Sequence, residues 1–325
     1  MRINLSSFLQ WRFNIYLIQK LGWTFTYFYI YLLGKLYFFI QLKEKRRIAA
    51  SIHTVFAERK KRSDIKSITR AVFRGICFHY YEKIFNAFSP VETLMAFFKT
   101  HINSQGTEAL DTALAGGKGV LLVTGHLGGV EYIPTYLGAN NYPVTIVVRF
   151  SSPNLRAMSL QKADKYGAKI IDADTTPNIM KAIFSHLTEN RIVIIQCDEI
   201  DEWRLSRKDK ILFLGKQTYL DKTINVLSKR TAAPVVFGIM HRGSNHRYKF
   251  MTISREEITK QFQQSVETTT GAMVMKFLEH YIYLYPDEWY QWKKYAAIET
   301  VPIAVAPVQA ELPVTFLEPS FGKLS

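Results

Sequence analysis

The chain contains little cysteine, which limits the kinds of site that it can form. Its 325 residues include two cysteines, Cys77 and Cys197, and no Cys-x-x-Cys or His-x-x-x-His spacing. Two cysteines build neither a disulfide framework nor a zinc cluster. We therefore expect no bound metal, and we expect Cys197, next to the apolar run Ile192–Ile195, to be a thiol of the core.

Several loops that bind cofactors or hold a nucleophile are also missing. The sequence has neither a Gly-x-Gly-x-x-Gly segment nor a Walker loop, so dinucleotide and nucleotide binding by those loops is unsupported. It has no Gly-x-Ser-x-Gly elbow, so a serine nucleophile is unsupported as well. We expect no cofactor.

Acidic residues are scarce relative to basic ones. The chain has 27 Asp and Glu against 42 Lys and Arg, a formal net charge of +15. Such a surface attracts polyanions, but no nucleic-acid-binding module is present, so we expect no nucleic-acid partner. The basic runs Lys43–Arg47 and Glu58–Arg62 suit either solvent or an anionic membrane surface.

An aromatic and apolar stretch, Leu21–Leu42, precedes the first basic run. Its length suits one membrane crossing, which takes about 20 residues. Gly34 and Lys35 interrupt it, so it would either span the membrane or lie at its surface; a helix buried in a soluble core is the alternative. The charge that follows predicts an inner-membrane protein whose main domain faces the cytoplasm.

Three regions are predicted from these patterns. Residues 1–42 would be the membrane-anchoring helix, residues 43–298 the main domain, and residues 299–325 a tail rich in proline and alanine. Within the main domain, short apolar runs alternate with amphipathic ones, which is typical of an α/β fold with a mixed, largely parallel central sheet flanked by helices. The expected strands are Gly119–Thr124, Val144–Arg149, Lys169–Ala173, Ile192–Asp198, Val235–Arg242 and Tyr248–Ser254, and the expected helices are Val130–Leu137, Pro153–Tyr166, Asn178–Glu189, Tyr219–Lys229 and Thr269–Tyr283.

The segment His126-Leu127-Gly128-Gly129-Val130-Glu131 follows the first of these strands. The strand would deliver His126 to its carboxyl end, where ligands gather in open α/β sheets. A histidine with a carboxylate nearby can act as a general base on a hydroxyl. A purely structural histidine at a strand end is the alternative, but no other histidine of the chain has a Gly-Gly turn and an acid behind it.

With this motif, the order of several segments resembles the bacterial lipid A biosynthesis (late) acyltransferases, which belong to the lysophospholipid acyltransferase-like superfamily. The segments cover about Lys43 to Tyr295. The third departs from the family pattern, because Ile200 stands where a second acid is usual. The matching segments are Gly125–Glu131, Val147–Arg149, Ile194–Glu199, Phe213–Lys216 followed by Ala233–Phe237, and Pro286–Trp292.

The resemblance implies a glycerolipid acyltransferase-like fold and transfer of an acyl chain from a thioester to a hydroxyl of a membrane lipid. The donor would be acyl carrier protein or acyl-coenzyme A. His126 would take the proton of the hydroxyl, and Glu131 would orient the imidazole, as the acid of a Ser-His-Asp triad does. The backbone N–H groups of Gly128 and Gly129 are candidates to stabilise the oxyanion.

Three further residues are candidates for substrate binding. Arg149 would clamp a phosphate, unless it is a surface ion pair. Asp198 would orient His126 or the acceptor, unless it caps a helix, and Glu199 would supply the second acid. The basic residues Arg204, Arg207, Lys208 and Lys210 are expected on a loop that could dock an acidic carrier protein.

Two other functions remain open at this level. One is a catalytically silent, membrane-attached binding protein of the same fold, although the presence of both His126 and Glu131 argues against it. The other is a membrane-bound thioesterase or hydrolase that uses the same two residues to activate water.

Overall fold

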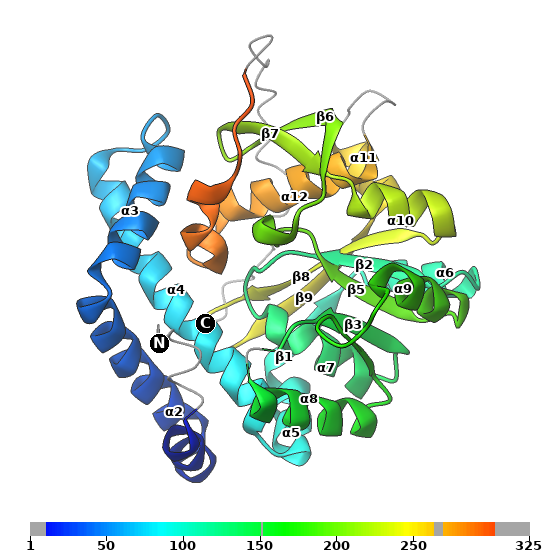
Figure 1. Cartoon of the computed structure of the whole chain (residues 1–325). Coiled ribbons are helices and arrows are strands. Elements are labelled where there is room, and N and C mark those ends of the chain that lie inside the picture. The colour runs from blue at the N-terminus through cyan, green and yellow to red at the C-terminus, as the bar shows by residue number, and fades with distance from the viewer. Residues whose placement is uncertain (1–10, 151, 263–268, 303–325) are drawn as a thin grey trace.

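A seven-stranded sheet forms the centre of the molecule (Figure 1). The computed structural model describes residues 11–150, 152–262 and 269–302. The strand order is β1-β9-β8-β2-β5-β3-β4, and every neighbouring pair is parallel except β8 and β9, which form an antiparallel hairpin. The strands are β1 Ile102–Gln105, β2 Val120–Thr124, β3 Val144–Val148, β4 Lys169–Asp172, β5 Ile192–Gln196, β8 Val235–Arg242 and β9 Tyr248–Ser254.

The predicted fold class is confirmed in the mixed, mostly parallel sheet with helices on both faces. The four α-helices from the N-terminal side are α2 Arg12–Ile40, α3 Leu42–Phe56, α4 Arg62–Phe88 and α5 Val91–His101. The others are α6 Glu108–Ala115, α7 Ile133–Ala139, α8 Pro153–Lys165, α9 Ile179–Thr188, α10 Thr223–Thr231, α11 Arg255–Phe262 and α12 Thr270–Leu284.

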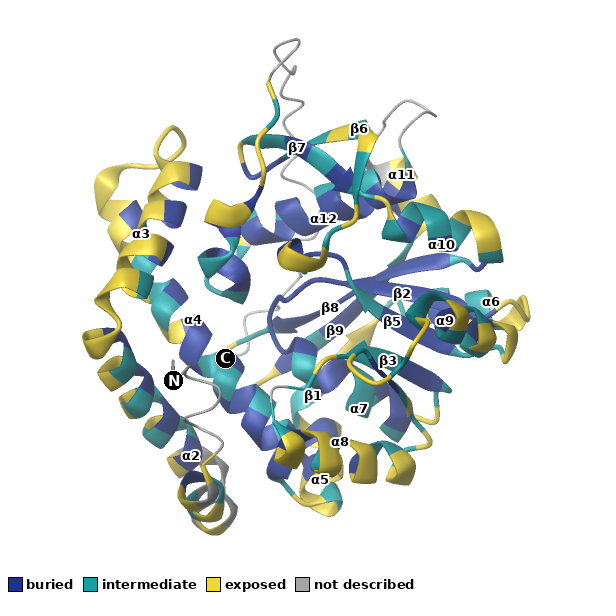
Figure 2. Ribbon diagram, viewed as in Figure 1, coloured by how far each residue is buried: buried dark blue, intermediate teal, exposed yellow. Residues whose placement is uncertain are grey.

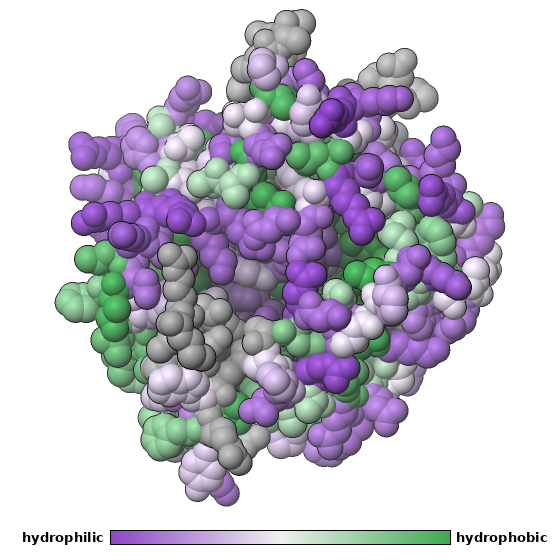
Figure 3. Space-filling model, in the orientation of Figure 1, coloured by the Kyte–Doolittle hydropathy of each residue, from purple (hydrophilic) through white to green (hydrophobic). Residues whose placement is uncertain are grey.

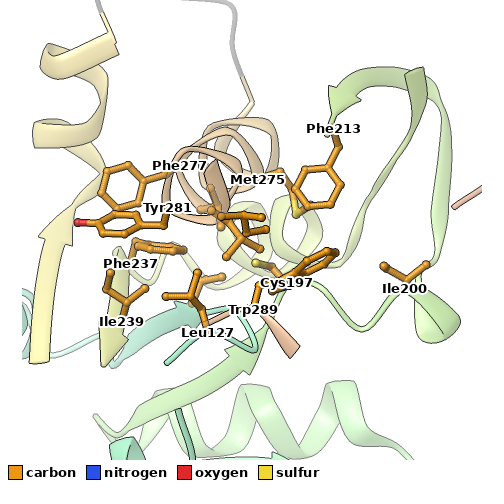
Figure 4. Packing of buried hydrophobic residues seen from close by; sticks show 14 of the residues in the cluster. Leu127, Cys197, Ile200, Phe213, Phe237, Ile239, Met275, Phe277, Tyr281 and Trp289 are labelled. Atoms are coloured by element: carbon orange, nitrogen blue, oxygen red, sulfur yellow. The ribbon is translucent and has the colours of Figure 1, made fainter. Parts of the chain in front are cut away.

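The central strand β2 shows why the sheet is covered on both sides. All five of its side chains are buried, because consecutive residues of a strand point to opposite faces and both faces carry helices. Leu121 and Val123 pack with α12 in one core, where Figure 4 shows Leu127, Cys197 and Trp289 close together. Their neighbours on β2 pack in the second core with residues of α4, α5 and α7.

The segment after β5 differs from the sequence-based expectation. Arg204, Arg207, Lys208 and Lys210 were expected on a loop, but β6 (Leu205–Phe213) pairs with β7 (Lys216–Asp221) in an antiparallel hairpin. The charged residues of this segment are typical of a solvated loop. The pairing of β6 with β7 depends instead on backbone hydrogen bonds and on Phe213, which is buried. The expected helix Tyr219–Lys229 is shortened for the same reason, since its first residues belong to β7.

A second correction concerns the helix expected at Val130–Leu137. The chain forms a short 3-10 helix at Val130–Tyr132, and α7 begins only at Ile133, with Pro134 in its first turn. A proline is tolerated there because the first N–H groups of a helix have no intrahelical partner. The 3-10 turn places Glu131 beside α4, with consequences for the site.

Helix α2 lies along α4 at the edge of the molecule (Figure 1). The two helices approach closely, since a Cβ on Gly34 would lie 2.4 Å from the Cys77 sulfur. Within the described residues, no single helix combines the length and apolar composition of a membrane span. The bent pair Phe25–Ile40 and Leu42–Phe56, which meet at 96°, satisfies those criteria jointly. The predicted C-terminal tail, from residue 303 on, lies outside the described residues.

A buried ion pair joins α4 to the β8–β9 hairpin. Glu82, which is fully buried, accepts two hydrogen bonds from Arg242, at 2.8 and 2.9 Å, and one from the Tyr248 hydroxyl at 2.8 Å. The same guanidinium donates to the Gly128 carbonyl at 3.4 Å. The pair therefore fixes α4 against the strand that supports the glycine turn.

We predict that Arg242→Met lowers the free energy of unfolding by about 3–5 kcal/mol, because it leaves a buried carboxylate without its cation. The double variant Glu82→Met with Arg242→Met should lose less, since both charges are removed. Urea denaturation followed by circular dichroism measures both. Arg255→Met, at an exposed position, is the control and should stay within about 0.5 kcal/mol of the parent. An Arg242→Met variant as stable as this control would show that the Glu82–Arg242 pair does not stabilise the fold.

Candidate active site

His126 lies just past the carboxyl end of β2 and is 3 % exposed. Asp198 lies equally far past the end of β5, the parallel neighbour of β2, and Thr124 is paired with Gln196 in that register. Each residue is therefore two positions beyond a paired residue, which brings the two side chains together at one edge of the sheet.

Asp198 holds the imidazole through one of its ring nitrogens. Its Oδ1 lies 2.7 Å from His126 Nδ1, and its Oδ2 accepts the His126 backbone N–H at 2.9 Å. The indole N–H of Trp289 donates to the same Oδ2 at 2.7 Å. Asp198 is fully buried, so its charge is balanced by these donors and not by water. Of the two roles considered for Asp198, the geometry favours orientation of His126.

The second ring nitrogen faces Glu199. The distance from His126 Nε2 to Glu199 Oε1 is 2.9 Å, and Glu199 Oε2 lies 2.7 Å from Lys294 Nζ. The Glu199 side chain is 35 % exposed, whereas His126 and Asp198 are buried. Nε2 is therefore the ring nitrogen on the side of the partly exposed carboxylate.

The two carboxylates change the protonation of the imidazole. Burial alone would lower the pKa of His126, but the charge and hydrogen bond of Asp198, together with the bond to Glu199, raise this pKa to about 9. Burial would raise the pKa of Glu199, yet its contacts with His126 and Lys294 lower that pKa to about 2. A pKa of His126 near 9 favours its imidazolium form at neutral pH.

Glu131 does not lie where the sequence-based interpretation expected it. Its Oε1 is 3.5 Å from both His79 Nε2 and Lys83 Nζ, two residues of α4. Both nitrogens of the His126 ring face other carboxylates, so the expected orienting contact from Glu131 is corrected to Asp198. The connection to His126 is indirect: the His79 ring stacks on Tyr290, with centroids 3.6 Å apart, and Tyr290 meets His126 edge-on at 4.7 Å.

The glycine turn supports the site through its backbone shape. Gly128 has a φ of +59°, and a Cβ there would lie 2.0 Å from the Met240 carbonyl oxygen. Its N–H donates to the Glu288 carbonyl at 3.0 Å, and the Gly129 N–H donates to the Met240 carbonyl at 2.7 Å. Both groups are therefore engaged within the protein. This corrects the expectation that they face an oxyanion.

Arg149 lies near the site but already has acidic partners. It is 2.8 Å from Asp174 and also contacts Glu202, and its side chain is 55 % exposed. The structure therefore shows the ion-pair alternative for Arg149. A phosphate would have to compete with two carboxylates for this guanidinium.

A pocket of about 690 Å³ opens in front of His126. Among the predicted residues, His126, Glu131, Arg149 and Glu199 line it, whereas Asp198, Gly128 and Gly129 do not. Its wall is completed by apolar residues of β3, β4 and α8 and by Lys83 of α4. Among the described residues, no group of three or more His, Cys, Asp or Glu side chains is arranged to hold a metal ion.

Sequence reasoning missed what α4 and the segment after α12 contribute to this site. Trp289 and Lys294 contact Asp198 and Glu199, and a signal existed, because Trp289 belongs to the resembling segment Pro286–Trp292. For His79 and Lys83 there was no comparable signal, since neither lies in a recognised motif.

The model of the family described as bacterial lipid A biosynthesis acyltransferase matches residues 4–294, most of the chain. No curated protein matches the chain.

We predict that the ring of His126 titrates near pH 9 and that Asp198→Asn lowers this pKa, because the substitution removes the negative charge at Nδ1. NMR titration of protein with labelled histidines measures both. His186 is the internal control: burial lowers its pKa below the ordinary value, and Asp198→Asn should leave it unchanged. A wild-type His126 that titrates at or below about 6.5 would show that the carboxylates do not hold the imidazolium.

Proposed function

The chain belongs to the bacterial lipid A biosynthesis acyltransferases, and we propose that it transfers a fatty acyl chain from a thioester to a hydroxyl of a membrane lipid. The observation that carries the proposal is a buried histidine, held at Nδ1 by Asp198, whose Nε2 faces a pocket large enough for an acyl chain. This is the arrangement that a general base needs.

The proposed reaction uses His126 twice. Neutral Nε2 takes the proton of the lipid hydroxyl while the oxygen attacks the thioester carbonyl and forms the new C–O bond. The tetrahedral intermediate then expels the sulfur, and the imidazolium returns the proton to the leaving thiolate. Asp198 stabilises the imidazolium in between, as the acid of a catalytic triad does.

Glu199 has to leave Nε2 before the acceptor hydroxyl can bind there. The structure offers a place for it, because Lys294 already contacts its other oxygen and also pairs with Asp201 at 3.0 Å. Loss of the Glu199 contact lowers the pKa of His126 and so favours the neutral base. We propose that acceptor binding and activation of the base are the same event.

Glu131 remains in the proposal with a different position. It lines the pocket and keeps Lys83 and His79 beside it, so its effect on catalysis would come through these residues. Arg149, at the rim, is proposed to bind a phosphate of the donor or acceptor. Gly128 and Gly129 contribute by shaping the turn that carries His126.

The donor is proposed to be acyl carrier protein or acyl-coenzyme A. The exposed basic residues of β6 offer a docking surface for an acidic carrier protein. Complementary charge of this kind acts mainly on the rate of encounter. These residues are Arg204, which precedes the strand, and Arg207, Lys208 and Lys210.

Helix α2 supports attachment to the inner membrane with the domain on the cytoplasmic side. Large apolar side chains on α2 recur at the spacing of one helical face, and all are exposed (Figures 2 and 3). The basic run that begins α3 follows directly, which suits anionic headgroups. The side chains of this face, hereafter the α2 stripe, are Phe25, Phe28, Leu32, Leu36 and Phe39.

We predict that His126→Ala lowers acyl transfer by about 10²–10⁴-fold without unfolding the protein, because the general base is lost. Glu131→Gln should cost less, since Glu131 does not contact the imidazole. His186→Ala, a substitution on α9, is the control. The assay is mass spectrometry of the acylated lipid formed by purified protein.

Two results would contradict the proposed function. One is a folded His126→Ala variant that keeps more than about a tenth of wild-type transfer, because a general base contributes far more than this. The other is thioester cleavage that proceeds equally fast without any lipid acceptor, which would identify a hydrolase.

We predict that Phe28→Ser, Leu32→Ser and Leu36→Ser together reduce binding to anionic vesicles at least about tenfold, because burying each large apolar side chain contributes roughly 1.5–3 kcal/mol. Vesicle flotation at high salt measures this, since salt screens the contribution of basic residues. Met95→Ser with Leu284→Ser, at exposed apolar positions outside α2, is the control. Equal flotation of all three proteins would exclude the α2 stripe as the membrane contact.

A further inference from the structure

One wall of the pocket carries a buried charge that the proposed reaction does not use. Residues of α8, and Tyr166 directly after it, form a stripe that faces the pocket at helical spacing. Lys162 is the one charged residue of this stripe. Its members are Leu155, Ser159, Lys162, Ala163 and Tyr166.

The ammonium group of Lys162 has spare donors. The side chain is 9 % exposed, and its Nζ donates to the backbone carbonyl of Asn86, near the end of α4. Among the described residues no carboxylate pairs with it, and burial, with the nearby charge of Lys165, lowers its pKa to about 8. An ammonium has three N–H donors, so the bond to the Asn86 carbonyl occupies one of them.

An unused acceptor belongs to the residue that Lys162 contacts. The Asn86 amide donates through Nδ2 to the Glu131 carbonyl at 2.7 Å, which fixes its orientation because only the NH₂ group can donate to a carbonyl. Its Oδ1 is buried and has no hydrogen-bond partner among the described residues. The Tyr166 hydroxyl, one helical turn beyond Lys162, is also buried and has no hydrogen-bond partner among the described residues.

We propose that Lys162 and Asn86 form a hydroxyl-binding subsite within the acyl pocket, so that the preferred donor carries a hydroxyl on its acyl chain. The proposal rests on the proposed function, acyl transfer. A hydroxyl can accept from Lys162 Nζ and donate to Asn86 Oδ1 at the same time, which satisfies both groups. A plain hydrocarbon chain would leave Asn86 Oδ1 and the remaining donors of Lys162 without partners, which is unfavourable.

The alternative ligands fit less well. A carboxylate or phosphate can accept from Lys162 but cannot donate to Asn86 Oδ1, and its negative charge would face that oxygen. A purely structural Lys162, which caps the carbonyls at the end of α4, would explain its contact with Asn86. It would leave the open acceptor unexplained, and it predicts no dependence on the substrate.

The test compares acyl thioesters of one chain length, either saturated or with the hydroxyl at successive carbons. For the wild-type protein we expect kcat/KM for one hydroxylated donor to exceed that of the saturated donor roughly 10- to 100-fold, the range expected for a hydrogen bond to a charged group. Lys162→Met and Asn86→Leu should each abolish most of this ratio. Lys165→Met, an exposed lysine of the same helix that does not line the pocket, should preserve it.

Two outcomes would overturn the subsite: a wild-type protein without preference for any hydroxylated donor, or a preference that survives in both folded variants. The ratio separates this role from a structural one, because reduced stability affects both donors alike. If no donor yields acylated lipid, the proposed function itself fails. Calorimetric binding of free hydroxylated and saturated fatty acids to the wild type and Lys162→Met then decides the subsite, and equal affinities would overturn it.

Discussion

The hydrogen bond between Asp198 and His126 is the contact on which the rest of the site depends. It exists because β2 and β5 are adjacent and parallel, so that their carboxyl ends deliver both side chains to one place. Trp289 donates a hydrogen bond to the second oxygen of Asp198. The backbone N–H groups of Gly128 and Gly129 donate to Glu288 and to Met240 of β8. With Nδ1 committed, the imidazole can react only through Nε2.

The contact at the other ring nitrogen affects the charge of His126. The second carboxylate, Glu199, occupies Nε2 and stabilises an imidazolium, which is not a base. In the reaction that we propose, a substrate hydroxyl that displaces Glu199 toward Lys294 removes this competitor and lowers the pKa of His126 at the same time. In this proposal, the negative charge beside His126 would also stabilise the imidazolium formed during transfer.

The sequence predicted the sheet well, because buried parallel strands are short apolar runs, as in β2 and β5. It located His126 after β2, and Asp198 and Glu199 after β5. These positions could be predicted because ligands gather at the carboxyl ends of strands in open α/β sheets. It paired His126 with Glu131 because they are close in the chain, whereas Asp198, 72 residues away, is the partner in space. The contributions of His79 and Lys83 could not be predicted, because hydrophobic periodicity does not show which residues of α4 lie beside the site. Strand β6 was predicted as a loop because its charged residues are typical of a solvated loop and do not indicate its pairing with β7.

The pH dependence of acyl transfer shows whether the two carboxylates hold His126 as an imidazolium. The kcat/KM profile reports the free protein, and the kcat profile reports the bound complex. We therefore expect kcat/KM to rise with pH through about 9, and kcat to reach its plateau at a lower pH because Glu199 has been displaced. Glu199→Gln should bring the kcat/KM limb down toward that of kcat. Identical limbs in both profiles of the wild type, unmoved by this substitution, would show that Glu199 does not control the charge of His126.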